Sequence, residues 1–432
     1  MARVKRDVYR AGPMSTPSRS FALTLGLSLF ACQTSQTVAP PPCPPVTAAA
    51  PPPVAVAPAV APEPQAQPAP KGPVAAPLDK NLARPDVIAK SAPLPGFMKG
   101  INLGNCLDAP TEGAWGAVLS EKHFEMAQAA GFDHVRLPVR FSTPERSGET
   151  APFKVNDEFM QRVDWAVDQA LARHLSIIID VHHFEEMNKD PNANKARLLA
   201  IWAQVAEHFA KRPPEVAFEI LNEPTEKLEP KLLNAITRDA IKVIRVKNPK
   251  RIIFADSYFW ANARRLAELD LPKDPNVVAQ FHMYEPILFT HQGAPWMDPP
   301  FQTRGVIFPG PPAAPVTPVP DAANEKWVAD WFKGYDELPA AENPGGPKAV
   351  FDYFDFAAKY VKATGKRVYL GEFGAIENAD QQSRENYLWL VRTEAERRGI
   401  GWAYWDDGGG FKAMNVYAGN WNEGLRRALL DK

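Results

Sequence analysis

Eight short runs rich in β-branched and aromatic residues recur between residues 97 and 432, and segments with helical spacing of apolar residues separate them. The runs are Met98–Leu103, His134–Leu137, Ser176–Val181, Glu215–Ile220, Arg251–Ala255, Val277–Phe281, Arg367–Leu370 and Gly401–Tyr404. Runs such as Ser176–Val181 are apolar almost throughout, which is typical of parallel strands covered on both faces. Eight βα units in about 300 residues match the size of a TIM barrel. We therefore predict an α/β fold, a (β/α)8 TIM barrel, for residues 96–432.

The segment 195–211 illustrates the helices expected between the strands. Apolar residues recur there at helical spacing, at Leu198, Trp202, Val205 and Phe209. Pro213 and Pro214 follow after Arg212 and end the predicted helix.

Proline marks two segments of a different kind. Residues 33–95 hold 18 prolines in 63 positions, with few charges and no amphipathic period before the barrel. Proline fixes φ and removes a backbone donor, so residues 32–95 are predicted to be a disordered, extended Pro/Ala-rich linker reaching roughly 200 Å at most. A second cluster, nine prolines in residues 295–320, falls in the long loop after the sixth strand and is expected beside the cleft.

The first 31 residues are typical of a signal peptide. Five basic residues accompany an apolar run, Phe21–Ala31, which is too short to span a bilayer. The run ends in Leu29-Phe30-Ala31 before Cys32, which resembles the lipobox of bacterial lipoproteins. We therefore expect a lipoprotein signal peptide at 1–31, lipidation of Cys32, and export with a lipid anchor in the bacterial envelope, at the outer membrane because Gln33 follows. The alternative is an ordinary signal peptide, a chance cysteine and a secreted protein.

The charge balance argues against a nucleic-acid partner. The formal net charge is −1, and without the first 31 residues it is −5. Three cysteines cannot form a disulfide framework. We expect a monomer without a nucleic-acid partner.

Polar and aromatic residues gather at the ends of seven of the eight predicted strands. They are Asn102, Asn105, Arg136, Asp180, His182, His183, Asn222, Glu223, His282, Tyr284, Glu372, Trp405, Asp406 and Asp407. Active sites of TIM barrels lie at the carboxyl ends of the strands, so these side chains should line one mouth.

Glu223 and Glu372 are the strongest catalytic candidates in that set. Pro224 follows Glu223 and biases it away from helix, and Glu372 lies between two glycines, where backbone can turn sharply. They follow the fourth and seventh strands, so their carboxyl groups can face each other across the mouth. Two such carboxyl groups are what a retaining glycosidase requires, one as proton donor and one as nucleophile. A surface salt bridge is the alternative for either glutamate alone.

Two other patterns at the mouth suggest binding. His182 and His183 could suggest a metal, but neighbours on a strand point to opposite faces, and we expect neither a metal nor another cofactor. Trp296 and Trp405 follow strand ends, where indole faces can stack on sugar rings.

Together these motifs resemble glycoside hydrolase family 5. The resemblance covers about residues 96–430 and rests on Gly100–Pro110, Arg136–Val139, Asp180–His183, Leu221–Pro224, His282–Tyr284, Phe289–Trp296, Gly371–Gly374 and Tyr404-Trp405. The order of all these motifs is far more specific than Asn-Glu-Pro alone. The sequence looks most like cellulase members, endo-β-1,4-glucanases, which implies a β-linked polysaccharide or oligosaccharide as substrate.

The resemblance also implies a role for each residue. Glu223 matches the general acid/base and Glu372 the nucleophile. The supporting residues are Arg136 and Tyr284 beside the nucleophile, Asn222 at the sugar 2-hydroxyl, and the active-site histidines His182 and His282. The implied substrate contacts are Asn105, His183, Trp296 and Trp405. Arg136 should favour ionised Glu372, which in turn should help Glu223 keep its proton near neutral pH.

Two departures from the family pattern concern substrate preference. Asp108 stands where relatives often have Glu, and Asp406-Asp407 stand where a Glu-Phe pair is commoner. An endo-β-mannanase or another β-glucanase would share the catalytic set. A non-catalytic glycan-binding lipoprotein and a metal-dependent barrel hydrolase are the remaining alternatives.

Overall fold

The computed structural model of the chain describes residues 73–431. The predicted signal peptide at 1–31, the predicted lipidation site Cys32 and residues 33–72 of the predicted linker lie outside the described residues. Within residues 73–431, no helix has both the length and the apolar character needed to cross a membrane.

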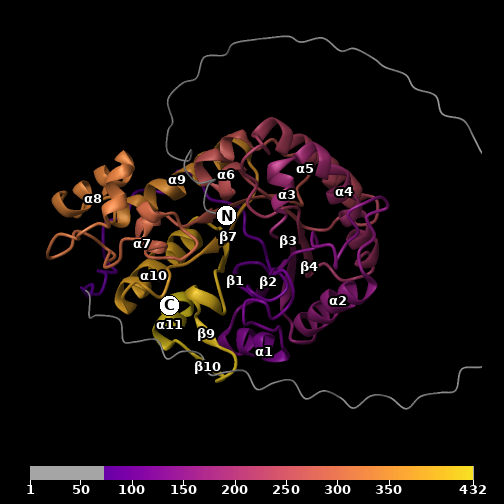
Figure 1. The fold of residues 1–432 in the computed structure, drawn as a ribbon, viewed down its shortest axis with the longest axis horizontal. Helices are drawn as coiled ribbons and strands as arrows, with labels where there is room; N and C mark the ends of the chain where they lie inside the picture. Colours follow the sequence, from indigo (N-terminus) through magenta and orange to yellow (C-terminus); the bar gives the residue numbers. More distant parts are fainter. Residues whose placement is uncertain (1–72, 432) are drawn as a thin grey trace, which may run out of the picture. The chain divides into compact units, whose positions relative to one another are not determined.

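Eight parallel strands form a closed barrel, in which each strand pairs with the next and β8 pairs with β1 (Figure 1). They are β1 (Lys99–Asn102), β2 (His134–Val139), β3 (Ser176–Val181), β4 (Val216–Glu219), β5 (Ile253–Asp256), β6 (Val277–Met283), β7 (Val368–Phe373) and β8 (Gly401–Tyr404). Each overlaps one of the predicted runs, so the TIM-barrel prediction is confirmed. β3 is buried along its whole length, as expected for a strand covered on both faces.

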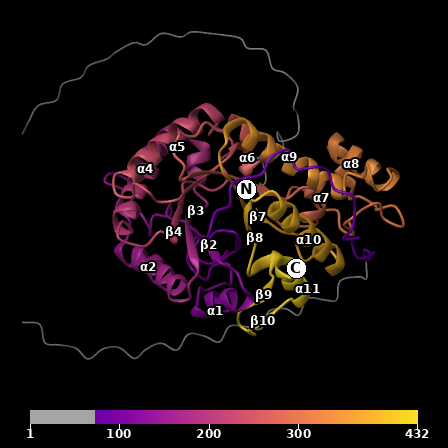
Figure 2. The ribbon, with the colours of Figure 1, turned by 180° about the vertical axis from the view of Figure 1, so that it is seen from behind.

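Helices surround the barrel, as the two opposite views show (Figures 1 and 2). They are α1 (Glu121–Ala130), α2 (Asp157–Ala172), α3 (Glu185–Lys189), α4 (Pro191–His208), α5 (Pro230–Arg245), α6 (Tyr258–Ala261), α7 (Ile287–Thr290), α8 (Lys326–Glu337), α9 (Pro347–Thr364), α10 (Gln381–Arg397) and α11 (Glu423–Leu430). The helix predicted at 195–211 is α4, which begins earlier because Asp190 caps it. The Asp190 side chain accepts from Ala193 N–H, and Pro191 occupies the first helical position.

A small apolar cluster fills the amino end of the barrel. Its buried members are Leu94, Phe97, Ile178, Ala217, Phe254, Val278, Tyr369 and Ala403. Leu94 and Phe97 precede β1, and the others lie on barrel strands, most of them in the first half of the strand. This end is therefore closed by packing, and a site must open at the other end.

Residues 73–95, here called the N-terminal strap, pack along α10. Strap amides donate to both ends of that helix: Ala75 N to Asp380 Oδ1 at 3.2 Å, and Ser91 N to Arg398 O at 2.8 Å. The packed unit thus begins before residue 96, the boundary predicted from the sequence. The prediction of a disordered linker used the average proline content of residues 33–95. That average gives no weight to single apolar side chains such as Leu94, which is buried in the apolar cluster at the amino end of the barrel.

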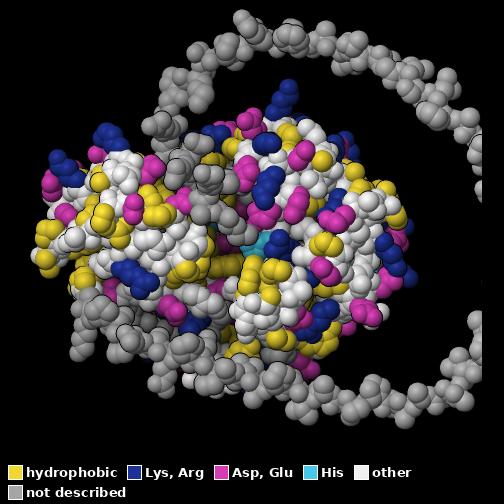
Figure 3. All heavy atoms as spheres, viewed as in Figure 1, with side chains coloured by type: hydrophobic (Ala, Val, Ile, Leu, Met, Phe, Trp, Pro, Cys, Tyr) yellow, Lys and Arg dark blue, Asp and Glu magenta, His cyan; other side chains and the backbone are white. Residues whose placement is uncertain are grey.

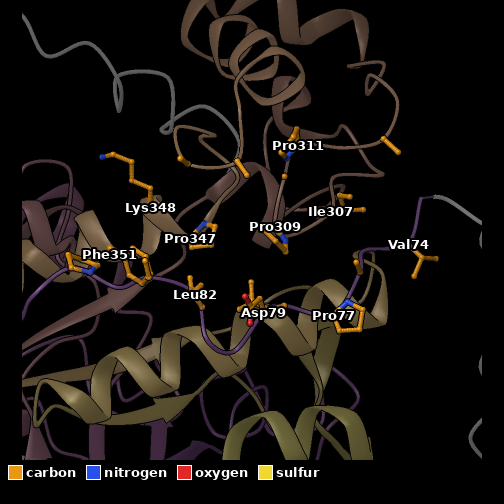
Figure 4. A pocket seen from close by; sticks show the side chains of 18 residues that line it. Val74, Pro77, Asp79, Leu82, Ile307, Pro309, Pro311, Pro347, Lys348 and Phe351 are labelled. Carbon is orange, nitrogen blue, oxygen red and sulfur yellow. The ribbon is translucent and has the colours of Figure 1, made fainter.

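The segment between β6 and α9 contains the proline-rich residues 295–320. It forms two short 3-10 helices, Pro299–Phe301 and Pro320–Asn324, before α8 begins. A cavity of about 780 Å³ lies between this segment, the N-terminal strap and the start of α9 (Figure 4). Its lining includes Pro77, Leu82 and Phe351, and none of the predicted catalytic or substrate-binding residues.

Candidate active site

Arg136, on β2, lies fully buried among the side chains at the carboxyl end of the barrel. Its guanidinium donates to six acceptor atoms: Glu219 Oε1 (2.6 Å), Glu219 Oε2 (2.7 Å), Asn102 Oδ1 (2.8 Å), Asn222 Oδ1 (2.8 Å), Glu372 Oε1 (2.8 Å) and Asp180 Oδ2 (2.9 Å). Burial alone lowers the pKa of Arg136, but the surrounding carboxylates outweigh burial and hold this pKa well above its usual value. Arg136 therefore connects residues from β1, β3, β4 and β7 through one permanent positive charge.

Glu372, on β7, is held by two donors. Arg136 Nη1 lies 2.8 Å from Oε1, and the Tyr284 hydroxyl donates to Oε2 at 3.0 Å. Burial raises the pKa of Glu372, whereas the charges of His282 and Arg136 lower it, and the net shift is upward. Arg136 thus acts in the expected direction, although burial has the larger effect.

Glu223 lies in the loop after β4 and has a left-handed backbone, with φ of 48°. Residues other than glycine rarely adopt this conformation, so the surrounding structure must maintain it. Asp256, at the end of β5, contributes by accepting from Glu223 N–H at 2.9 Å. The side chain of Glu223 is 28% exposed and that of Glu372 only 6%, so Glu223 is the more accessible of the two.

His282, on β6, stands between the two glutamates. Its Nδ1 is 3.0 Å from Glu223 Oε1 and 3.5 Å from Glu372 Oε2, and its Nε2 is 3.9 Å from Asp256 Oδ2. Burial lowers the pKa of His282, but the three carboxyl groups outweigh burial and raise it to about 9, so the ring is positively charged at neutral pH. Glycine at position 371 leaves room for this ring, because a Cβ there would lie 2.9 Å from His282 Nε2.

The two glutamates are close enough for direct cooperation. One carboxylate oxygen of Glu223, one of Glu372 and a ring nitrogen of His282 all lie within 4.8 Å of one another. Retaining glycosidases place their carboxyl groups about 5–5.5 Å apart, and inverting enzymes about 6.5–9.5 Å apart. The spacing here corresponds to the retaining geometry.

His182 and Asn222 form a second connected pair. Asn222 Nδ2 lies 3.3 Å from His182 Nε2, and His182 Nδ1 lies 2.5 Å from Asp180 Oδ2. Burial and nearby positive charges hold the pKa of His182 well below its usual value, so the ring is neutral. Since an amide nitrogen only donates, Nε2 must accept and Nδ1 carries the proton, facing Asp180.

The expectation that His182 and His183 point to opposite faces is wrong. β3 ends at Val181, and His183 has φ of 51°, so strand alternation no longer applies. The two rings meet with centroids 4.5 Å apart. Among residues 73–431, donor atoms lie within 4.8 Å of one another in three groups that could hold a cation: Asp108–His182–His183, Glu219–Asp256–His282 and Glu223–His282–Glu372.

Trp405 lies beside His182, with parallel rings at 5.6 Å. The glycine at position 104 permits this placement, because a Cβ there would lie 3.1 Å from the Trp405 indole. The Asn105 amide donates to Asp406, so that amide is already engaged within the protein. Histidine surface appears at the centre of the molecule with hydrophobic side chains beside it (Figure 3).

Trp296 belongs to an aromatic wall between the loops after β6 and β8. It is 46% exposed, and its ring lies 6.3 Å from His291 and 6.2 Å from Phe411. Both of these rings also contact Tyr284, the partner of Glu372. This wall links Trp296 to the catalytic centre.

The positions that depart from the family pattern are all buried. Asp108, Asp406 and Asp407 are each at most 1% exposed. Burial raises the pKa of all three carboxyl groups, that of Asp407 to about 8.

Asp256 and Glu219 are functional candidates that sequence reasoning missed. Glu219 accepts twice from Arg136, and Asp256 holds the backbone of Glu223. Asp256 ends β5 and directly follows the run predicted as the fifth strand, so its position is the same strand-end signal that marks the other candidates. Glu219 gave no such signal, because it lies within the run predicted as the fourth strand.

Comparison with known proteins agrees with this geometry. A family model described as cellulase (glycosyl hydrolase family 5) matches residues 98–410. The chain is 30% identical over 309 residues to endoglucanase H of Acetivibrio thermocellus, covering 72% of this chain and 29% of that protein. It is 28% identical over 349 residues to endoglucanase 3 of Fibrobacter succinogenes, covering 77% of this chain and 52% of that protein. The chain thus spans less than two thirds of either relative.

Among solved structures, endoglucanase Cel5A from the hyperthermophilic Thermotoga maritima is similar over the barrel. The TM-score is 0.66 and the sequence identity 34%, covering 77% of this chain and 97% of that chain. Structures of that protein include complexes with cellobiose and with mannotriose.

Proposed function

The chain belongs to glycosyl hydrolase family 5, and from this premise and the site geometry we propose that it hydrolyses internal β-1,4 bonds of glucan chains with retention of configuration. The observation that carries the retaining part is the carboxylate spacing of Glu223 and Glu372, within 4.8 Å. The glucan part is supported by the similarity to endoglucanases.

In the first step, Glu372 is the nucleophile. An oxygen of ionised Glu372 forms a bond to the anomeric carbon while the bond to the leaving oxygen breaks, and that oxygen takes the proton of Glu223. Arg136 and the Tyr284 hydroxyl hold the Glu372 carboxylate in place. The products are a glycosyl ester on Glu372 and a shortened chain with a new hydroxyl end.

In the second step, Glu223 is the general base. A water oxygen attacks the anomeric carbon, its proton passes to Glu223, and the ester bond to Glu372 breaks. Both glutamates return to their starting protonation states. The charged His282 between them lies where it stabilises negative charge on either carboxylate, so its position fits both steps.

The remaining residues position the sugar. Asn222 Oδ1 already accepts from Arg136, which leaves its amide N–H groups for His182 and the sugar 2-hydroxyl. Trp405 would lie under the reacting sugar, with Asn105, His183 and Trp296 on the non-reducing side. These assignments follow the family pattern and fit the placement of the four side chains around the centre.

The proposal is tested by incubating the protein with carboxymethylcellulose, barley β-glucan and glucomannan and measuring the reducing ends released. We expect release from carboxymethylcellulose and barley β-glucan. Because cleavage is internal, the viscosity of the solution should fall sharply while only a small share of the bonds has been broken. If the wild-type protein released no reducing ends from any β-glycan, the proposal would be contradicted.

An endo-β-mannanase is the second candidate. It is favoured by the mannotriose complex of the similar Thermotoga protein and by a catalytic set that suits either sugar. Release from pure mannan at a higher kcat/KM than from β-glucan would establish this alternative.

We also propose that the protein is exported as a monomer anchored through a lipid on Cys32, on the basis of the basic, apolar and lipobox-like segments before it. Metabolic labelling with a palmitate analogue should mark the wild type and not Cys32→Ser, and the labelled protein should partition into detergent. Equal labelling of both proteins would contradict the anchor at Cys32. The oligomeric state is tested separately by light scattering in detergent, which should give the mass of one chain.

A further inference from the structure

The loop between β1 and α1 presents an exposed aromatic residue beside His183, at the carboxyl end of the barrel. Trp115 is 44% exposed and the neighbouring Val118 is 49% exposed, although large apolar side chains are usually buried. Tyr417, from the loop between the short strands Met414–Asn415 and Asn420–Trp421, is 78% exposed and donates to Gly116 O at 3.2 Å. An exposed aromatic side chain from a distant segment thus contacts the backbone of Gly116, the residue that follows Trp115. Exposed apolar side chains that gather in this way are typical of a binding surface.

A row of rings connects this place to the catalytic centre. Trp405 stacks on His182 at 5.6 Å, His182 meets His183 at 4.5 Å, and His183 meets Trp115 edge-to-face at 5.5 Å. Trp115 thus lies beyond His183 when followed outward from the sugar platform Trp405. A β-1,4-linked glucan chain is linear, so a chain that passes the histidines reaches Trp115 next.

The loop that carries Trp115 is fixed in its conformation. Glu112 accepts from Leu119 N–H at 2.9 Å and binds Arg162, on α2, through two hydrogen bonds of 2.7 and 3.0 Å. Within the loop, Gly113 N–H donates to Ala117 O at 3.1 Å. The indole is therefore presented before substrate arrives, which reduces the ordering cost of binding.

We propose that Trp115, with Tyr417 beside it, forms an outer sugar-binding subsite on the non-reducing side of the cleft. It takes one pyranose ring of a β-1,4-linked oligosaccharide by stacking of the sugar's C–H face on the indole. This proposal rests on the proposed function for the direction of the chain. It predicts a preference for chains long enough to extend past His183.

The test compares kcat/KM for β-1,4-gluco-oligosaccharides from three to six units in wild type and Trp115→Ala. The ratio of the value for the longest to that for the shortest should fall roughly fivefold in the variant, a typical size for one lost aromatic contact. Most of the change should appear in KM, and Trp115→Phe should recover part of it. An equal ratio in wild type and Trp115→Ala would overturn the subsite.

Two controls separate failure of this subsite from failure of the proposed function. Val246→Ala removes a side chain that is 74% exposed at the end of α5, and it should leave the ratio unchanged. If wild type cleaves none of the oligosaccharides, the proposed function fails, and quenching of tryptophan fluorescence by the six-unit chain still tests the subsite. Equal affinity of wild type and Trp115→Ala in that titration would overturn it.

Discussion

Both ends of the barrel contain buried side chains, but those at the amino end are mainly apolar and those at the carboxyl end are mainly charged or polar. The amino end is an apolar cluster around Leu94 and Phe97, and its polar pair, His134 and Tyr369, is joined by a 2.6 Å hydrogen bond. The carboxyl end concentrates charged groups, and buried polar atoms such as Asp256 Oδ1 and His282 Nε2 have no hydrogen-bond partner among the described residues. Unsatisfied buried polar atoms destabilise a fold, so the carboxyl end is organised for chemistry and the amino end for stability.

The largest expected effect comes from Glu372→Ala at the carboxyl end. Without the nucleophile, kcat should fall by about 10⁴-fold or more, while the variant stays folded because Glu219 and Asp180 still pair with Arg136. Steady-state kinetics and urea denaturation measure both. Glu377→Ala, which removes an exposed glutamate from the following loop, is the matched control and should keep wild-type kcat.

Azide rescue sharpens the assignment of the two glutamates. Glu372→Ala should be rescued with an inverted glycosyl azide, and Glu223→Ala with a retained one, because azide replaces the nucleophile in the first case and water in the second. The opposite pairing would mean that the two roles are exchanged.

Phe97→Ala tests the amino end. The side chain is 2% exposed, so its removal should lower the free energy of unfolding by about 3–5 kcal/mol and leave the kcat of the folded enzyme unchanged. Urea denaturation gives the first quantity and active-site-normalised kinetics the second. A large loss of kcat in the folded variant would show that the two ends are not independent.

Asp256→Ala should weaken proton donation by Glu223. It removes the acceptor that holds the left-handed backbone of Glu223, so kcat on substrates with poor leaving groups should fall by up to about 100-fold. An aryl cellobioside whose leaving group is a very acidic phenol needs little proton donation, so kcat on this substrate should fall much less in Asp256→Ala. Asp256→Asn keeps an acceptor oxygen and should restore part of the rate, whereas equal losses on all leaving groups would contradict this role.

The smallest effect expected is a fall in stability with rising pH. The folded pKa of His282, about 9, lies above its ordinary value of 6.5, so this contribution is fully present below about pH 6.5 and is lost as pH rises through 9. Asp256, with a pKa raised to about 8 mainly by burial, acts in the same direction. The free energy of unfolding should fall on the order of 2 kcal/mol between pH 7 and 9.5, and less in His282→Gln. A rise over this range would contradict the charged His282.

The sequence predicted the barrel because the apolar runs and helical spacings are local signals. It also predicted which residues follow the strand ends. It could not predict the left-handed backbones of His183 and Glu223, which depend on contacts such as the one between Glu223 and Asp256. The predicted start of the packed domain, residue 96, was too late in the chain. Packing of residues 73–95 depends on the surface of α10, which is distant in the sequence.

The stereochemistry of hydrolysis tests the central claim most directly. Proton NMR can follow the anomeric signals of the first product released from a β-1,4-gluco-oligosaccharide, before mutarotation mixes the two forms. The close approach of Glu223 and Glu372 predicts that the β-anomer appears first. Initial formation of the α-anomer would contradict the double-displacement mechanism and the roles assigned to both glutamates.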